Sequence, residues 1–253
     1  MIKKKKDIDA IRISGKILAR VLSALKEKVA PGVRLSDLDL YARELLKKEN
    51  ARPVFLNYQP EGADKPYPAA ICTSVNEKIV HGVPNAYVVR EGDLVKIDIG
   101  VEYGGYIADA AVTAGAGTIS RIAKKLMDVT ERSLYCGIEE CVPGNTLGDV
   151  GNAIESVVHK GKFSVIRGLT GHGVGFELHE EPTVYNFGKS GTGMKLREGM
   201  VLAIEPMVST GSPDIIQLSD ESYATSDGSL SAHFEHTVAI TKNGPEILTR
   251  FIV

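Results

Sequence analysis

The chain has 253 residues, of which 43% are hydrophobic and 25% are charged, a composition ordinary for a soluble globular protein. Its 30 lysines and arginines nearly balance its 32 aspartates and glutamates, and a net charge of −2 argues against a global field for binding DNA or an anionic membrane. Three cysteines without a Cys-x-x-Cys pair argue against a disulfide framework and favour the reducing cytoplasm, and no uncharged apolar run near ~18 residues predicts a membrane span.

The first part of the chain is predicted to form two helices. Apolar residues recur at helical spacing from Ile8 to Val29, with charged residues between them, and Pro31-Gly32 ends the pattern. Ser36 with Asp39 three residues later resembles a capping box, which predicts a second helix reaching to about Glu49.

The same arrangement recurs 112 residues further along the chain. Val142-Pro143-Gly144 corresponds to Ala30-Pro31-Gly32 (31 + 112 = 143), and Leu147 corresponds to Leu35 in the same register. A helical pattern from Ser120 to Cys141 precedes the second Pro-Gly pair, as one precedes the first. This self-similarity predicts an internal duplication, with two related halves packed around a pseudo-twofold axis.

Between and after the helices, the hydrophobic pattern changes to a period of two. Asp93 to Ala114 is predicted to form two strands joined by a turn at Tyr103-Gly104-Gly105. Met200 to Val208 and Phe234 to Thr241 show further strand patterns. Helices combined with hairpin-connected strands predict a single α+β domain over residues 1–253.

Four acidic residues stand where the strand patterns should be apolar, at Asp98, Asp109, Glu205 and Glu235. An ionised carboxylate is very costly to bury unless it is paired, protonated or bound to a cation. One such residue would usually form a structural ion pair, but four without matching buried lysines or arginines favour a multivalent cation. The alternative, four scattered surface acids, conflicts with the apolar runs that surround them.

His172 is the natural nitrogen ligand, because glycines at 171, 173 and 175 let another group approach its backbone closely. Taken alone, this segment is also compatible with a loop of solvated histidines. Four carboxylates and one imidazole carry enough negative charge for two divalent ions, and two-metal hydrolases hold such ions roughly 3.5 to 4 Å apart. Oxygen-rich coordination favours cobalt, manganese, iron or zinc over copper.

The motifs around these residues resemble those of the type I methionine aminopeptidases, members of the metallo-aminopeptidase family with the pita-bread fold. The resemblance extends from the first helix almost to the C-terminus and implies two pseudo-symmetric halves with an antiparallel sheet covered by helices. From His179 to Glu205 there are 26 positions (205 − 179), too few for the large helical insertion of type II enzymes. The matching motifs are Asn76-Glu77, His81-Gly82-Val83-Pro84, Asp98 with Asp109, Gly171–Gly175, His179–Pro182, Glu205-Pro206-Met207 and Ser231–Thr237.

The resemblance implies a site for two divalent metal ions. Asp98 and Asp109 would bind one ion, and His172 and Glu205 would bind the second. Asp109 and Glu235 would bridge the two ions. The identity of the physiological metal does not follow from such a set of ligands, because a carboxylate-rich site accepts several metals.

The same resemblance implies a methionyl aminopeptidase, which removes the initiator methionine from nascent chains whose second residue is small. The metals would activate the water that attacks the first peptide carbonyl, and Glu205 would pass a proton to the leaving amine. His179 would stabilise the tetrahedral intermediate, and His81 would hydrogen-bond the peptide beyond the scissile bond, so both would also contact the substrate. The remaining histidines, His159, His233 and His236, are predicted to be packing or surface residues.

The pocket for the first side chain differs from that of the bacterial relatives that this chain resembles. Tyr67 and Cys72 match pocket positions, whereas Leu178 and Glu221 stand where an aromatic residue and a tryptophan are usual, and the chain has no tryptophan. An apolar pocket of Tyr67, Cys72 and Leu178 would still suit an unbranched thioether. The motifs therefore support the expected reaction more strongly than they support a preference for methionine over leucine.

Two alternatives remain at this stage. One is a related dinuclear aminopeptidase with another N-terminal specificity, including Xaa-Pro bonds, and the other is a non-catalytic binding protein on the same fold. The expected partners are nascent polypeptide N-termini, acted on by a cytoplasmic monomer. The lysines at 3–6 are predicted to be a solvated, disordered end, although a transient contact with ribosomal RNA would also suit them.

Overall fold

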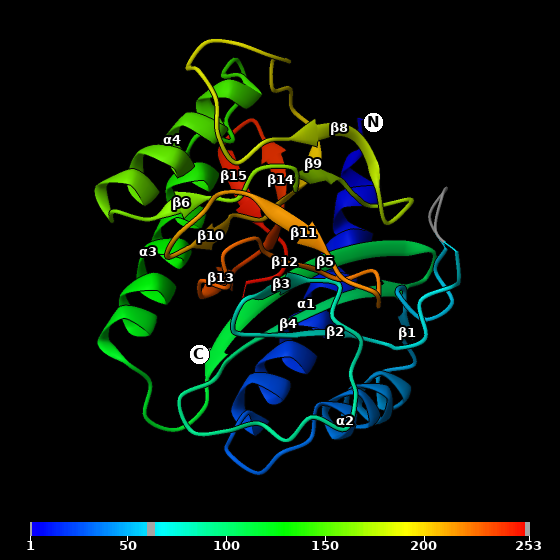
Figure 1. The fold of residues 1–253 in the computed structure, drawn as a ribbon. Coiled ribbons are helices and arrows are strands. Elements are labelled where there is room, and N and C mark those ends of the chain that lie inside the picture. Colours follow the sequence, from blue (N-terminus) through cyan, green and yellow to red (C-terminus); the bar gives the residue numbers. More distant parts are fainter. Residues whose placement is uncertain (1, 60–63, 251–253) are drawn as a thin grey trace.

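The computed structural model describes residues 2–59 and 64–250, so the very ends of the predicted domain and residues 60–63 lie outside the description. In these described residues, four helices and a set of antiparallel strands build a mixed α+β fold, in which the helices lie outside the strands (Figure 1). Within the described ranges, no helix combines the length and apolarity that a membrane crossing requires.

The two halves predicted from the sequence are visible in the helices. Helix α2, Leu35–Lys48, and helix α4, Leu147–Lys160, are offset by 112 residues at both ends (35 + 112 = 147 and 48 + 112 = 160). The glycine before each helix also adopts the same left-handed conformation, with φ of 94° at Gly32 and 99° at Gly144. The longer helices α1 and α3 precede them, at Lys5–Lys28 and Arg121–Glu139.

Two local predictions for the N-terminal helices were wrong. Arg34, not Ser36, is the N-cap of α2, and no side chain caps this helix. Asp39 instead accepts hydrogen bonds from the backbone N–H of Ala70 and the guanidinium of Arg43, so its carboxylate is used in a tertiary contact. The lysine run is also not wholly solvated, because Lys3 is buried beside the segment that follows β7.

The predicted hairpin is confirmed as two ten-residue strands, β4 and β5, joined by a turn in which Gly104 and Gly105 have positive φ. Strands β1 and β2 pair with the other edge of β4. The strand bounds in the first half are β1 Arg52–Pro53, β2 Cys72–Val75, β3 Lys78–Val80, β4 Leu94–Tyr103 and β5 Tyr106–Gly115.

A five-stranded sheet in the order β15-β14-β9-β7-β8 forms the second half, and two three-stranded sheets, β13-β10-β6 and β11-β12-β3, complete the structure. The bounds here are β6 Ser164–Val165, β7 Gly171–Gly173, β8 Glu180–Val184, β9 Val201–Ile204, β10 Met207–Ser209, β11 Ile215–Gln217, β12 Tyr223–Thr225, β13 Ser231–His233, β14 His236–Thr241 and β15 Gly244–Ile247.

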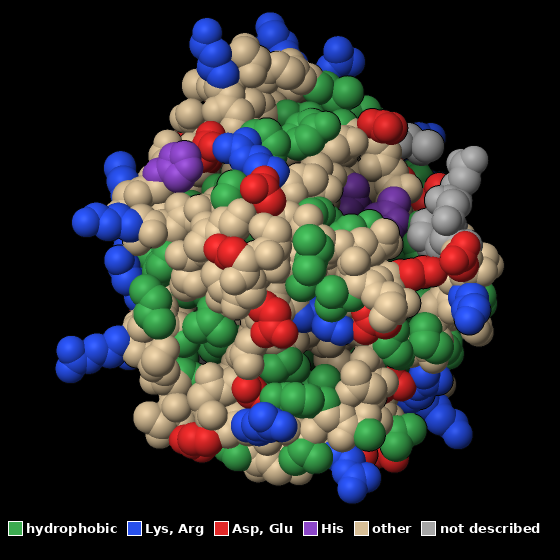
Figure 2. All heavy atoms as spheres, in the orientation of Figure 1, with side chains coloured by type: hydrophobic (Ala, Val, Ile, Leu, Met, Phe, Trp, Pro, Cys, Tyr) green, Lys and Arg blue, Asp and Glu red, His purple; other side chains and the backbone are tan. Residues whose placement is uncertain are grey.

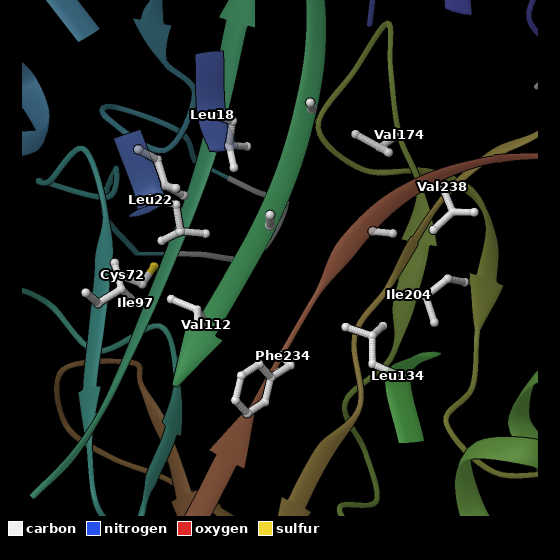
Figure 3. Close-up of a cluster of buried hydrophobic side chains, with 14 of the residues drawn as sticks. Leu18, Leu22, Cys72, Ile97, Val112, Leu134, Val174, Ile204, Phe234 and Val238 are labelled. Carbon is white, nitrogen blue, oxygen red and sulfur yellow. The ribbon is translucent and has the colours of Figure 1, made fainter. Parts of the chain in front are cut away.

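The hydrophobic core runs across both halves. Helix α1 packs against β4 and β5, and α3 packs against β9, β10 and β13 of the second half. Figure 3 shows Leu18 and Leu22 of α1 facing Val112 of β5, with Ile204 and Val238 on the far side of Phe234. This continuous packing holds the strands of the two halves in a fixed relation, which positions the polar residues described next.

Candidate metal centre

Two of the four acids come from the hairpin of the first half. Asp98 is paired with Ala111 and Asp109 with Gly100, so both carboxylates lie on one face of the β4–β5 ladder at diagonal positions. Gly100 carries no side chain opposite Asp109, and Phe55, Leu178 and Val54 pack over it, with atoms 3.0 to 3.3 Å from where a Cβ would lie. Thr237 holds Asp109 in place, since its hydroxyl accepts from the Asp109 N–H at 2.9 Å and donates to the Asp109 carbonyl at 2.7 Å.

His172 enters the site from strand β7. A side chain at Gly171 would place its Cβ 2.3 Å from the carbonyl oxygen of Ala203, and one at Gly173 would come within 2.4 Å of the Glu181 carbonyl. The glycines therefore allow the close strand approach predicted from the sequence. The Nδ1 of His172 lies 2.9 Å from the Gly173 carbonyl, which makes Nδ1 the protonated nitrogen and leaves the Nε2 lone pair facing the carboxylates.

Glu205 and Glu235 complete the cluster from the second half. Glu205 follows β9, and its Oε1 lies 3.4 Å from His172 Nε2, which is also 3.9 Å from Asp109 Oδ2. Glu235 lies between β13 and β14, and its N–H donates to the carbonyl of Ala111, beside Asp109 on β5. Ligand atoms of Asp109, His172 and Glu235 all lie within 4.8 Å of one another.

The cluster brings four carboxyl groups close together, and their pKa values are raised. Burial, reinforced by repulsion from neighbouring carboxylates, raises the pKa of Asp98, Glu205 and Glu235 well above the ordinary range. Burial also raises the pKa of Asp109 to about 7 and lowers the pKa of His172 to about 4. His172 is therefore neutral near pH 7, which is the protonation state of a metal ligand.

The hydrogen bonds of the cluster agree with a bound cation. Among the described residues, no lysine or arginine forms an ion pair with any of the four acids, and Lys96 instead donates to the carbonyls of Asn76 and Ser231. Buried oxygens with no hydrogen-bond partner remain on three of the acids. Such oxygens are costly to bury unless something coordinates them. The residues present therefore fit divalent cations, and the orphaned oxygens are Asp98 Oδ1, Asp109 Oδ1 and Glu235 Oε1.

His233 was predicted to be a packing or surface residue, but it lies at the cluster. Its Nε2 is 3.5 Å from Glu205 Oε2, and together with Glu235 it forms a second group of ligand-type atoms. Burial lowers the pKa of His233 to about 3. The signal was present in the sequence, because residues two apart in an extended segment share a face. His236, which was also predicted to be a packing or surface residue, is buried, and its Nδ1 lies 2.9 Å from the hydroxyl of Thr249.

His179 and His81 line the cleft above the cluster. The ring of His179 lies 4.5 Å from that of His172, edge to face, and its Nδ1 is 2.8 Å from the hydroxyl of Tyr58. His81 contacts the ring of Tyr223 at 5.8 Å and is not among the clustered ligand atoms. Both histidines have an exposed surface in the cleft, but desolvation by the surrounding protein atoms lowers the pKa of each.

The cleft has a volume of about 1520 Å³ and contains all five predicted metal ligands in its lining. Histidine side chains are visible in a recess on the face drawn in Figure 2. Cys72, paired with Asp98 across β2 and β4, and Leu178 are buried at its wall. Tyr67 is fixed by its hydroxyl, which donates to the carbonyls of Ile71 and Gly82. The predicted pocket residues are thus brought to the same cavity as the acids.

This fold with a cluster of acids and a histidine in its cleft is that of a metallopeptidase of the pita-bread type. The profile of metallopeptidase family M24 matches residues 9–242, and the chain belongs to this family. It belongs, more narrowly, with the methionine aminopeptidases. It is 47% identical to the methionine aminopeptidase of Clostridium perfringens and 43% identical to methionine aminopeptidase 1 of Bacillus subtilis, over 98% and 97% of each pair of chains.

The solved structures agree with this assignment. The methionine aminopeptidase of Thermotoga maritima superimposes with a TM-score of 0.94, at 43% identity over 99% of both chains. The prolidase of Pyrococcus horikoshii has the same fold, with a TM-score of 0.74 and 25% identity, over 99% of this chain and 64% of its own. The resemblance predicted from the motifs is therefore confirmed, and with it the pita-bread fold and the enzyme class.

Proposed function

We propose that this protein removes the N-terminal methionine from nascent proteins and peptides, preferentially when the second residue is small. The observation that carries the proposal is the cluster of four acids and His172 that lines one cleft, in a chain similar over 98% of its length to a methionine aminopeptidase. The related Xaa-Pro specificity has less support, because the prolidase neighbour is much less similar than the methionine aminopeptidases.

The ligands for two divalent ions, in this proposal, are Asp98, Asp109, His172, Glu205 and Glu235. The two ions would be cobalt, manganese, iron or zinc. They would activate water and polarise the first peptide carbonyl. Glu205 combines a carboxylate beside His172 with a pKa raised by burial, so it is suited to pass a proton to the leaving amine.

His179 and His81 contact the substrate in this proposal. The hydroxyl of Tyr58 can donate to Nδ1 of His179, which places the proton on Nε2 as a hydrogen-bond donor for the developing oxyanion. His81, further along the cleft, would hydrogen-bond the peptide beyond the scissile bond. Tyr67, Cys72 and Leu178 would form the apolar wall that receives the methionine side chain.

The wider setting is part of the proposal. We place the enzyme in the cytoplasm as a monomer, with residues 1–253 acting as one catalytic domain on nascent N-termini. Transient contact with the ribosome would use the exposed lysines at positions 4–6.

The test is the release of amino acids from Met-Ala-Ser, Leu-Ala-Ser and Ala-Pro-Ser by metal-stripped protein, with and without added manganese or cobalt. Metal-dependent release of methionine from the first peptide, at least ~10-fold faster than leucine from the second, is expected. Equal cleavage of Leu-Ala-Ser, or cleavage of Ala-Pro-Ser alone, would overturn the substrate assignment. No cleavage with either metal would overturn the proposed activity.

A further inference from the structure

Lys3 is buried although it opens a run of four lysines. Its side chain is 0% exposed, and its ammonium group forms an ion pair with Glu180, whose side chain is 6% exposed. The same ammonium lies 5.2 Å from the centre of the Phe176 ring. Lys4, Lys5 and Lys6 are all exposed. Burying a lysine is costly unless its charge is paired. The ion pair with Glu180 therefore explains why Lys3 is buried while the next three lysines are exposed.

The chain end is fixed to the second half of the molecule at this point. The backbone N–H of Lys3 donates to the carbonyl of Gly199 at 2.7 Å. Gly175 leaves room for the lysine, because a Cβ at this position would lie 2.8 Å from Lys3 Cε. A side chain at Gly175 would therefore displace the end of the Lys3 side chain from its place beside the carboxylate.

Glu180 organises the turn that precedes it. Its Oε1 accepts hydrogen bonds from the backbone N–H of Phe176 at 2.7 Å and of Glu177 at 3.2 Å, while Oε2 binds Lys3. Burial raises the pKa of Glu180, but the hydrogen bonds that its carboxylate accepts from Lys3 and Phe176 outweigh this effect. The pKa of Glu180 is therefore below its ordinary value. The carboxylate thus stays ionised, and it links the turn at 175–180 to the N-terminal segment.

His179 is the residue next to Glu180 and faces the cleft on the other side of this turn. We infer that Lys3 is a positioning residue for His179, so that the N-terminal segment of the chain holds the catalytic turn in place through Glu180. The inference rests on the proposed role of His179. A misplacement of about 1 Å at a group that contacts the reacting atoms can lower turnover by up to ~100-fold.

The experiment compares Lys3→Met with Lys6→Met, which removes an exposed lysine of the same run. Lys3→Met is expected to lower kcat on Met-Ala-Ser by ~10-fold with KM within about twofold, while Lys6→Met leaves both unchanged. Lys3→Arg, which keeps the charge, should recover most of the lost turnover. Glu180→Gln should lower kcat similarly, and the double variant Lys3→Met/Glu180→Gln should lose little more, because the two residues form one contact.

Amide hydrogen exchange separates this inference from the proposed activity. In Lys3→Met, the amides of Phe176 and Glu177 should exchange at least ~10-fold faster while those of α3 keep their rates. If the protein released no methionine, the proposed function would fail, and faster exchange at these amides would still support the link to Lys3. Unchanged exchange at 176 and 177, or an equal loss of kcat in Lys6→Met, would overturn the inference.

Discussion

At the residue scale, the carboxylates of the cluster determine what the site can bind and how much their burial lowers the stability of the metal-free protein. Asp109 is at the centre, since it lies beside Asp98 on the hairpin and within 3.9 Å of His172. Without a cation, burial raises its pKa to about 7, so the folded protein holds a proton that the unfolded chain releases near its ordinary value of 3.8. In the proposed metal site, a divalent ion would take the place of that proton.

This shift predicts how stability depends on pH in the metal-free protein. A carboxyl whose folded pKa is raised contributes stability below its unfolded pKa and loses it as the pH rises through the folded value. The free energy of unfolding of the wild type, relative to Asp109→Asn, should therefore fall between about pH 4 and about pH 7. Urea unfolding in the presence of a chelator, at several pH values, measures this difference in the free energy of unfolding between the two proteins. A difference that rises over this pH window would contradict the burial argument.

His179 gives a second prediction at this scale. Replacing it with alanine should lower kcat by ~10² to 10³-fold, the usual loss when one oxyanion donor is removed. Metal binding should persist, because His179 is not among the clustered ligand atoms. His159→Ala is the control, since His159 is a histidine with a side chain 61% exposed on α4. A normal kcat in His179→Ala would remove this residue from the proposed mechanism.

The candidate ligands could be predicted from the sequence because each acid interrupts an apolar strand pattern, and burial makes that conflict visible. Other residues near the site could not be predicted by that argument. Tyr58 reaches His179 from a loop with no periodic pattern, and Lys3 looks like its solvated neighbours. Their roles depend on contacts across 121 and 177 positions of the chain.

At the scale of elements, strand β7 delivers His172 only because its flanking glycines let β8 and β9 approach. The helix pairs were predictable, since amphipathic periodicity and the Pro-Gly repeat are local signals. The N-cap of α2 was not predictable from its sequence, because the Asp39 carboxylate accepts a hydrogen bond from the distant Ala70 N–H instead of taking part in a capping box. Local propensity yields to tertiary contacts of this kind.

Gly173→Ala tests the role of this close approach. The added Cβ would lie 2.4 Å from the Glu181 carbonyl, a backbone atom that cannot move alone, so the variant should lose ~1–3 kcal/mol of stability. It should also bind manganese more weakly, because His172 shifts with its strand. Gly105→Ala at the β4–β5 turn is the control, as it strains the backbone at φ 83° with no neighbour within 4 Å. Equal manganese affinity in both variants would contradict this account.

At the scale of the whole molecule, the site is divided between the two halves. Asp98 and Asp109 come from the first half, and His172, Glu205 and Glu235 come from the second. Neither half holds the full set, so the duplication visible in the helices has a functional consequence at the interface of its two copies. Hydrophobic packing of α1 and α3 on the strands keeps the two sets of candidate ligands together.

The most direct test of this account is methionine release from Met-Ala-Ser as manganese is added to metal-stripped protein, with Asp109→Asn measured beside the wild type. We predict that the wild type gains activity with added metal. The variant should remain at least ~100-fold slower at every concentration, because loss of a partner outside the metal's own ligands already costs 10 to 100-fold. Near-normal release by Asp109→Asn, or full activity of the wild type without metal, would contradict the metal site described here.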